Sequence, residues 1–115
     1  MLMKDRTGFV AGVANRRSIA WAVARALDRE GTQLALGYLG ERELEAIEPL
    51  LEQLQTAPVL IQCDATDEDS VGAAFDTAAK ELGRLDCLVH AIAFANREDL
   101  VGRFADTSIE GYQLA

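Results

Sequence analysis

Short apolar segments alternate with longer amphipathic ones along this chain, and this alternation limits its fold more than any other feature. Four segments have the length and composition of buried strands. They are residues 8–12, 34–37, 58–62 and 85–91. Four such strands separated by helices predict a parallel sheet that is covered by helices on both faces. Right-handed crossovers give the order 3-2-1-4, so the expected class is α/β, a Rossmann-like doubly wound sheet.

The first helix has clear start and stop signals. Ser18 is placed to cap it, and Gly31 is placed to end it. The apolar spacing predicts an inward face made of Ile19, Ala22, Val23, Ala26 and Leu27. The same spacing leaves four charged residues in solvent, namely Arg25, Asp28, Arg29 and Glu30.

The later helices are marked by proline, glycine and acidic residues. Pro49 must kink the helix expected over 41–55, or begin a second short one. Thr66 or Asp67 opens a helix that ends at Gly83, with acidic residues in its first turn as the helix dipole favours. The sequence therefore predicts three covering helices, one after each of the first three strands.

The end of the chain is the least regular part. Residues 107–110 have the spacing of a capping box, and the chain stops one or two turns later. A doubly wound sheet would place a fifth strand beside the fourth. We therefore expect a domain truncated after its fourth strand, with an open sheet edge that makes the isolated chain prone to self-association.

Composition excludes several classes of function. The net charge is -8, so the surface repels nucleic-acid backbones and anionic lipid. Residues 1–6 lack the apolar core of a signal peptide, and no apolar run approaches the ~20 residues that span a bilayer. Cys63 and Cys87 lie far apart in apolar stretches, which favours reduced core thiols over a metal site or a disulfide. We expect a soluble, cytoplasmic protein that binds no metal, nucleic acid or membrane.

The turn after the first strand is the first candidate site. Gly12 allows a tight turn and a close approach of ligand to backbone, and Ser18 stands at the entrance of the next helix. The unpaired N–H groups of a helix N-terminus bind diphosphate. Ala14 replaces the second glycine of the usual G-x-G-x-x-G pattern. On spacing alone, a nucleotide turn and an ordinary capped helix are equally good interpretations.

Other candidates follow the second, third and fourth strands. Asp64 could accept a hydrogen bond from an adenine amino group, although aspartate is also common at helix entrances. Glu41 could bind ribose hydroxyls and Arg42 could favour a 2′-phosphate, but both are better explained as surface residues. His90 is interpreted as a packed, hydrogen-bonded residue rather than a catalytic one. Gly12, Asp64 and residues 91–93 all follow strand ends, where such sheets bind ligands.

These segments together resemble one family. Residues 12–20 resemble the divergent nucleotide loop of bacterial-type enoyl-acyl-carrier-protein reductases, which belong to the short-chain dehydrogenase/reductase superfamily. Residues 37–41 fall at that family's second-strand turn, and Cys63-Asp64 matches its adenine-side segment. Residues 83–95 resemble its fourth strand and following loop, and 110–112 fit the start of its next helix. The resemblance covers essentially the whole chain in order.

The resemblance implies an oxidoreductase of fatty-acid elongation that reduces the trans-2 double bond of an acyl chain on acyl carrier protein. The implied cofactor is NADH, with NADPH not excluded, and full-length members are expected to be homo-oligomers. Residues 1–115 are then a partial NAD(P)-binding domain. The implied cofactor-binding residues are Gly12, Ser18, Ile19, Leu39, Asp64, Ala65 and Ile92. Ala95 is the implied substrate-binding residue.

No catalytic residue is assigned, because neither Tyr38 nor Tyr112 matches the family's catalytic tyrosine and neither Lys4 nor Lys80 matches its lysine. Those groups stabilise the enolate oxygen and hold the nicotinamide ribose, so we expect the isolated chain to be inactive. The alternatives are a non-catalytic NAD(H)-binding module or pseudogene product, and a short-chain reductase with another substrate. Ala-Ile-Ala-Phe in place of Asn-Ala-Gly at 91–94 argues against the last of these.

Overall fold

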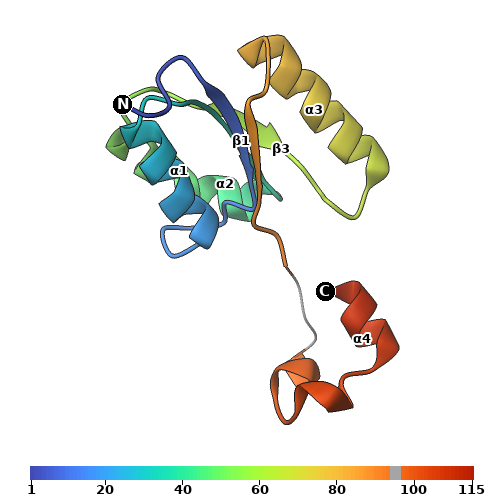
Figure 1. Ribbon diagram of the computed structural model, residues 1–115. Helices are drawn as coiled ribbons and strands as arrows, with labels where there is room; N and C mark the ends of the chain where they lie inside the picture. The colour runs from blue at the N-terminus through green and yellow to red at the C-terminus, as the bar shows by residue number, and fades with distance from the viewer. Residues whose placement is uncertain (94–96) are drawn as a thin grey trace.

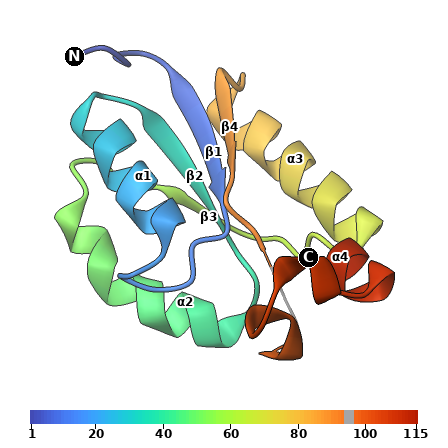
Figure 2. The same ribbon diagram turned by 60° about the horizontal axis from the view of Figure 1, so that its bottom comes forward.

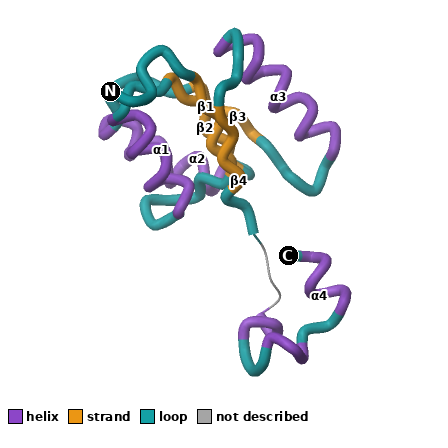
Figure 3. Tube along the Cα trace, viewed as in Figure 1, coloured by secondary structure: helices purple, strands orange, loops and turns teal. Residues whose placement is uncertain are grey.

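The computed structural model describes residues 1–93 and 97–115 and contains the predicted sheet (Figures 1 and 3). All its strand pairs are parallel, and the strand order is β3-β2-β1-β4. Its strands are β1 (Thr7–Ala11), β2 (Gln33–Tyr38), β3 (Val59–Gln62) and β4 (Cys87–His90). In the register of the sheet, Val10 of β1 lies beside Leu36 of β2 and Val89 of β4. The predicted fold class and strand order are confirmed.

Helices cover both faces of the sheet. Figure 2 shows α1 (Ile19–Arg29) and α2 (Glu41–Ile47) on one face, and α3 (Glu68–Leu82) on the other. Successive side chains of a strand point to opposite faces, and both faces of the central strands are buried. The core under α1 and α2 includes Val10, Leu34, Leu36 and Trp21. The core under α3 includes Phe9, Ala35, Ile61 and Ala74.

The predicted helix boundaries are largely confirmed. The Ser18 hydroxyl accepts a hydrogen bond from the Trp21 N–H at 3.3 Å and so caps α1. Asp67 caps α3, and Gly83 follows it with a φ of 80°. Pro49 lies in the first turn of a separate 3-10 helix, η1 (Glu48–Gln53), which resolves the choice between a kink and a second helix.

The face of α1 that packs inward differs from the prediction. The buried residues are Ala20, Trp21, Ala24 and Asp28, whereas Ile19 is 77 % exposed. This is a rotation of about one residue, or about 100°. The rotation buries Trp21, the largest side chain of the helix. It also buries Asp28, whose carboxylate accepts hydrogen bonds from the backbone N–H groups of Gln55 and Thr56 at 2.8 and 3.4 Å.

β4 is an outer strand of the sheet. It pairs with β1, and Leu88 on it is 51 % exposed. His90 is exposed, so the prediction of a packed histidine is wrong, because only one side of this strand has a neighbour in the sheet. The apolar character of residues 85–91 indicated burial that an edge strand does not provide.

The C-terminal part consists of short helices beyond the carboxyl end of the sheet (Figure 1). They are η2 (Arg97–Leu100), η3 (Phe104–Asp106) and α4 (Ile109–Leu114). Ser108 caps α4 by accepting from the Gly111 N–H at 2.9 Å. The capping residue is therefore one position later than the Thr107–Glu110 spacing indicated. Among the described residues, no helix is long and apolar enough to cross a membrane.

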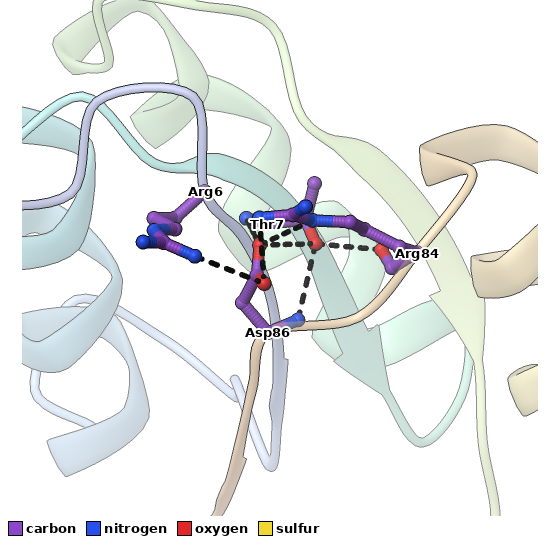
Figure 4. Close-up of polar contacts among 4 residues, drawn as sticks. All are labelled: Arg6, Thr7, Arg84 and Asp86. Atoms are coloured by element: carbon purple, nitrogen blue, oxygen red, sulfur yellow. Dashed lines mark hydrogen bonds and ion pairs between the residues drawn. The ribbon is translucent and has the colours of Figure 1, made fainter.

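A polar cluster ties β1 to β4 at the amino end of the sheet (Figure 4). The Asp86 carboxylate accepts from the Thr7 N–H at 2.8 Å and from Arg84 Nε at 3.1 Å. The Thr7 hydroxyl donates to the Arg84 carbonyl at 2.6 Å, and Arg6 Nη1 lies 3.7 Å from Asp86 Oδ1. The hydrogen bond from Thr7 and the contacts with Arg84 hold the pKa of Asp86 below its ordinary value of 3.8.

We expect Asp86→Asn to lower the melting temperature at neutral pH. Because folding lowers the pKa of Asp86, its stabilising effect is complete above about pH 4 and is lost as the pH falls through the folded-state pKa. The difference in melting temperature between wild type and variant should therefore be largest at pH 7 and shrink below about pH 4. Thermal unfolding followed by circular dichroism across this pH range measures it.

Asp106→Asn is the matched control. It also removes one carboxylate from an ion pair with arginine, but the side chains of Arg103 and Asp106 are 80 % and 62 % exposed. Exposed pairs of this kind contribute little to stability. Equal melting temperatures for Asp86→Asn and wild type at pH 7 would show that the cluster does not stabilise the fold.

Candidate nucleotide-binding site

The carboxyl ends of the four strands surround a cavity of about 330 Å³. Gly12 follows β1, Leu39 follows β2, Asp64 and Ala65 follow β3, and Ile92 follows β4; all five line this cavity. These residues come from four separate parts of the chain. The fold thus brings together most of the cofactor-binding residues expected from the sequence.

Gly12 occupies a position where no other residue fits. Its φ is 103°, in the region that favours glycine. A Cβ there would collide with the Ala91 carbonyl group, lying 2.7 Å from its carbon. The N–H groups of Gly12 and Val13 both donate to the Gly37 carbonyl oxygen, at 3.2 and 3.0 Å. The backbone turn is thereby fixed against β2 on one side and against the end of β4 on the other.

The N-terminus of α1 follows this turn. The Ser18 hydroxyl donates to the Asn15 carbonyl at 2.8 Å and accepts from the Trp21 N–H. Within residues 1–93 and 97–115, the N–H groups of Ile19 and Ala20 donate to no protein acceptor. Unpaired N–H groups at the positive end of a helix dipole form an anion site. Ser18 therefore shapes the helix entrance, and its neighbours supply the free donors.

Asp64 has a defined geometry at the rim of the cavity. Its Oδ1 accepts from the Thr66 N–H at 3.0 Å and from the Thr66 hydroxyl at 2.7 Å. Its own N–H donates to Ser70 Oγ at 2.9 Å. The hydrogen bonds from Thr66 lower the pKa of Asp64, so it is ionised at neutral pH. Oδ1 is engaged locally, which leaves Oδ2 as the acceptor for a ligand.

The remaining walls of the cavity are mostly apolar. Cys63 lies beside Asp64, and burial together with the Asp64 charge raises the pKa of its thiol. Cys63 is therefore a protonated, poorly nucleophilic part of the wall. Leu114 of α4 also lines the cavity. Sequence reasoning missed Leu114, since no motif connects the end of the chain with the strand ends.

A second, more open cavity of about 500 Å³ lies on the other side of the β4 end. Ile19 lines it together with His90, Ala91, Ile92 and Ala93. The exposure of Ile19 therefore places an apolar side chain next to the strand ends. Ala95, the substrate-binding residue expected from the sequence, lies outside the described residues.

A third cavity, of about 180 Å³, opens between the Gly12 turn and α2. Its lining includes Leu39, Ala14 and Glu43. Glu41 and Arg42, the two residues considered from the sequence for ribose or phosphate binding, are exposed and do not line it. Sequence reasoning missed Glu43, although it lies only two positions after Glu41. Ile92 and Ala93 line all three cavities, which are therefore parts of one surface.

A parallel sheet ordered 3-2-1-4, a glycine turn into a helix N-terminus and a cleft across the strand ends are the features of the Rossmann class of folds. The family profile described as Enoyl-(Acyl carrier protein) reductase matches residues 12–115. The chain therefore belongs to the enoyl-(acyl carrier protein) reductase family.

Curated relatives agree with this assignment. The chain is 43 % identical over 115 residues to the enoyl-[acyl-carrier-protein] reductase [NADH] of Bacillus cereus, covering 99 % of this chain and 45 % of that protein. It is 44 % identical over 114 residues to the enoyl-[acyl-carrier-protein] reductase [NADPH] of Staphylococcus aureus, covering 98 % and 44 %. The chain thus spans less than half the length of these relatives.

Solved structures show the same likeness. The Bacillus cereus reductase with NADP+ and indole naphthyridinone has a TM-score of 0.88 at 42 % identity, covering 99 % of this chain and 45 % of that one. The Anaplasma phagocytophilum reductase in complex with NAD has a TM-score of 0.87 at 40 % identity, covering 98 % and 43 %.

We expect Gly12→Ala to weaken the fold and abolish nucleotide binding. An alanine at this φ costs about 1–3 kcal/mol, and its Cβ collides with the Ala91 carbonyl. Urea unfolding and titration with NADH measure the two effects.

Gly72→Ala is the matched control. Gly72 lies within α3 and has open space where a Cβ would be, so alanine should stabilise the helix by about 0.5–1 kcal/mol. If Gly12→Ala bound NADH as tightly as wild type does, nucleotide binding would not require the close approach of β1 to β4 at Gly12.

Proposed function

We propose that this chain is the nucleotide-binding portion of an enoyl-[acyl-carrier-protein] reductase and that it binds NADH across the carboxyl ends of β1–β4. The observation that carries the proposal is the cavity that joins Gly12, Leu39, Asp64, Ala65 and Ile92. Membership of the family over residues 12–115 indicates the reaction, in which the trans-2 double bond of an acyl thioester is reduced.

The diphosphate of the cofactor is assigned to the turn between β1 and α1. The free N–H groups of Ile19 and Ala20 point from the positive end of the helix, and Ser18 orders that end. Gly12 carries no side chain that could block the approach, and its φ and contacts admit none. These residues fit a dinucleotide diphosphate without any basic side chain.

Adenine is assigned to the cavity beside β3. The ionised Asp64 carboxylate has one oxygen available to accept a hydrogen bond from the exocyclic amino group. Ala65, Leu39 and Ile92 provide apolar surface for the faces and edges of the base. The combination of mostly apolar walls and an ionised acceptor suits a purine with one amino group.

The nicotinamide half is assigned to the open cavity beside the β4 end, where Ile19 and Ile92 lie. When bound, the cofactor supplies the hydride. The apolar side chains of Ile19 and Ile92 would contact the nicotinamide ring there. Ala95 remains the proposed border of the acyl substrate.

Several partners and properties belong to the same proposal. The substrate is a thioester carried on acyl carrier protein, NADPH is the second candidate cofactor, and the whole protein is a cytoplasmic homo-oligomer. A net charge of -8 supports a partner other than nucleic acid or an anionic membrane surface.

The test is calorimetric titration of the purified chain with NADH, with an enoyl-thioester reduction assay in parallel. We expect saturable binding without turnover from these 115 residues, since none of them matches the family's catalytic tyrosine and lysine. The proposal is wrong if NADH does not bind. Turnover would show that catalytic groups have been overlooked within these residues.

We expect Asp64→Ala to weaken binding of NADH and of 5′-AMP about tenfold, because the adenine amino group loses its charged acceptor. Asp67→Ala is the control: it removes a carboxylate three residues later, where Asp67 only caps α3. That variant should lose some stability and bind both ligands within about twofold of wild type. Equal losses of affinity in the two variants would argue against adenine recognition by Asp64.

A further inference from the structure

Thr66 is an exposed residue in the lining of the nucleotide cavity, and its hydroxyl is hydrogen-bonded to Asp64. We propose that Thr66 is a positioning residue that holds the Asp64 carboxylate in one orientation and thereby makes the cavity select adenine over 6-oxo purines such as hypoxanthine. This inference rests on the proposed function, in which Asp64 accepts from the adenine amino group, and adds the residue that makes this contact selective.

The backbone of Asp64 is fixed by the start of α3. Its N–H donates to Ser70 Oγ at 2.9 Å, and its carbonyl oxygen accepts from the Asp67 N–H at 3.1 Å. Asp67 caps α3, and Ser70 lies near the beginning of that helix. Both polar backbone groups of Asp64 are therefore held by the helix entrance, so its main remaining freedom is rotation about its side-chain bonds.

Thr66 restricts that rotation. Its N–H and its hydroxyl both donate to the same atom, Asp64 Oδ1, at 3.0 and 2.7 Å. Because two donors meet at Oδ1, turning the carboxylate away would break both hydrogen bonds. Oδ2 is then held at one place, and within residues 1–93 and 97–115 it accepts no hydrogen bond from the protein.

Hydrogen bonds rather than a cation hold this carboxylate. The described lining of the cavity contains no lysine, arginine or histidine that could pair with Asp64. The Thr66 hydroxyl contributes most to lowering the pKa of Asp64, followed by the Thr66 N–H. Asp64 is therefore ionised at neutral pH, and an ionised carboxylate accepts hydrogen bonds but cannot donate them.

An acceptor in a fixed position distinguishes purines at position 6. Adenine carries an amino group there, which can donate to Oδ2, whereas hypoxanthine carries a carbonyl oxygen, which cannot donate and would face a negative charge. Hypoxanthine has a donor at the neighbouring N1, and a carboxylate free to rotate could reach it. A carboxylate held by Thr66 cannot follow, so the 6-oxo base leaves the acceptor unpaired.

The experiment compares ligands that differ at position 6 of the base. The full chain is titrated calorimetrically with 5′-AMP and 5′-IMP, and with NADH and its hypoxanthine analogue. We expect wild type to prefer the amino ligand of each pair by about tenfold. Thr66→Val should reduce both preferences to about threefold or less, because the freed carboxylate can turn to the N1 donor. Thr66→Ser keeps the hydroxyl and should retain both preferences.

Thr77→Val is the matched control, because it removes an exposed hydroxyl that donates to the Ala73 carbonyl at 3.0 Å within α3 and does not line the cavity. It should leave both preferences within about twofold of wild type. A merely structural role of Thr66 would weaken amino and oxo ligands by the same factor and leave the preferences unchanged.

Three outcomes overturn the inference. Wild type binds 5′-IMP as tightly as 5′-AMP, Thr66→Val changes the preferences no more than Thr77→Val, or Thr66→Ser loses them as Thr66→Val does. The proposed function stands in each of these cases as long as wild type binds NADH. Failure of wild type to bind both NADH and 5′-AMP overturns the proposed function itself, and the inference with it.

Discussion

The close approach of three backbone segments at Gly12 is the constraint on which the rest of the site depends. The Gly12 and Val13 N–H groups are held by Gly37 of β2, and the Ala91 carbonyl at the end of β4 fills the space of a side chain. This approach brings the ends of β1, β2 and β4 onto one surface. It also sets the direction in which α1 starts, and hence where its free N–H groups point.

The Thr7–Asp86 cluster and the candidate nucleotide site lie at opposite ends of the sheet. At the amino end, the cluster around Thr7 and Asp86 joins the start of β1 to the start of β4. At the carboxyl end, Asp64 and the α1 N-terminus keep polar groups available for a ligand.

Some residues were placed correctly from sequence and others were not, for identifiable reasons. Ser18, Asp67 and Gly83 act through local backbone geometry, which the sequence encodes within a few residues. The burial of His90 was predicted wrongly, because an apolar run indicates a strand but not whether that strand has one neighbour in the sheet or two. The face of α1 was misplaced by one residue, since burial of Trp21 and the hydrogen bonds of Asp28 to Gln55 and Thr56 depend on contacts across the fold.

The sequence by itself determined the alternation of strands and helices, the strand order and the residues that follow each strand, because hydrophobic periodicity and the handedness of crossovers are local or general rules. It also carried the motifs that led to the family. Only the tertiary structure decided which side chains share the cleft. Glu43 rather than Glu41 lines it, and Leu114 lines it from the end of the chain. The physical reason is that a side chain's direction on a helix, and its distance from a strand end far away in sequence, are set by packing.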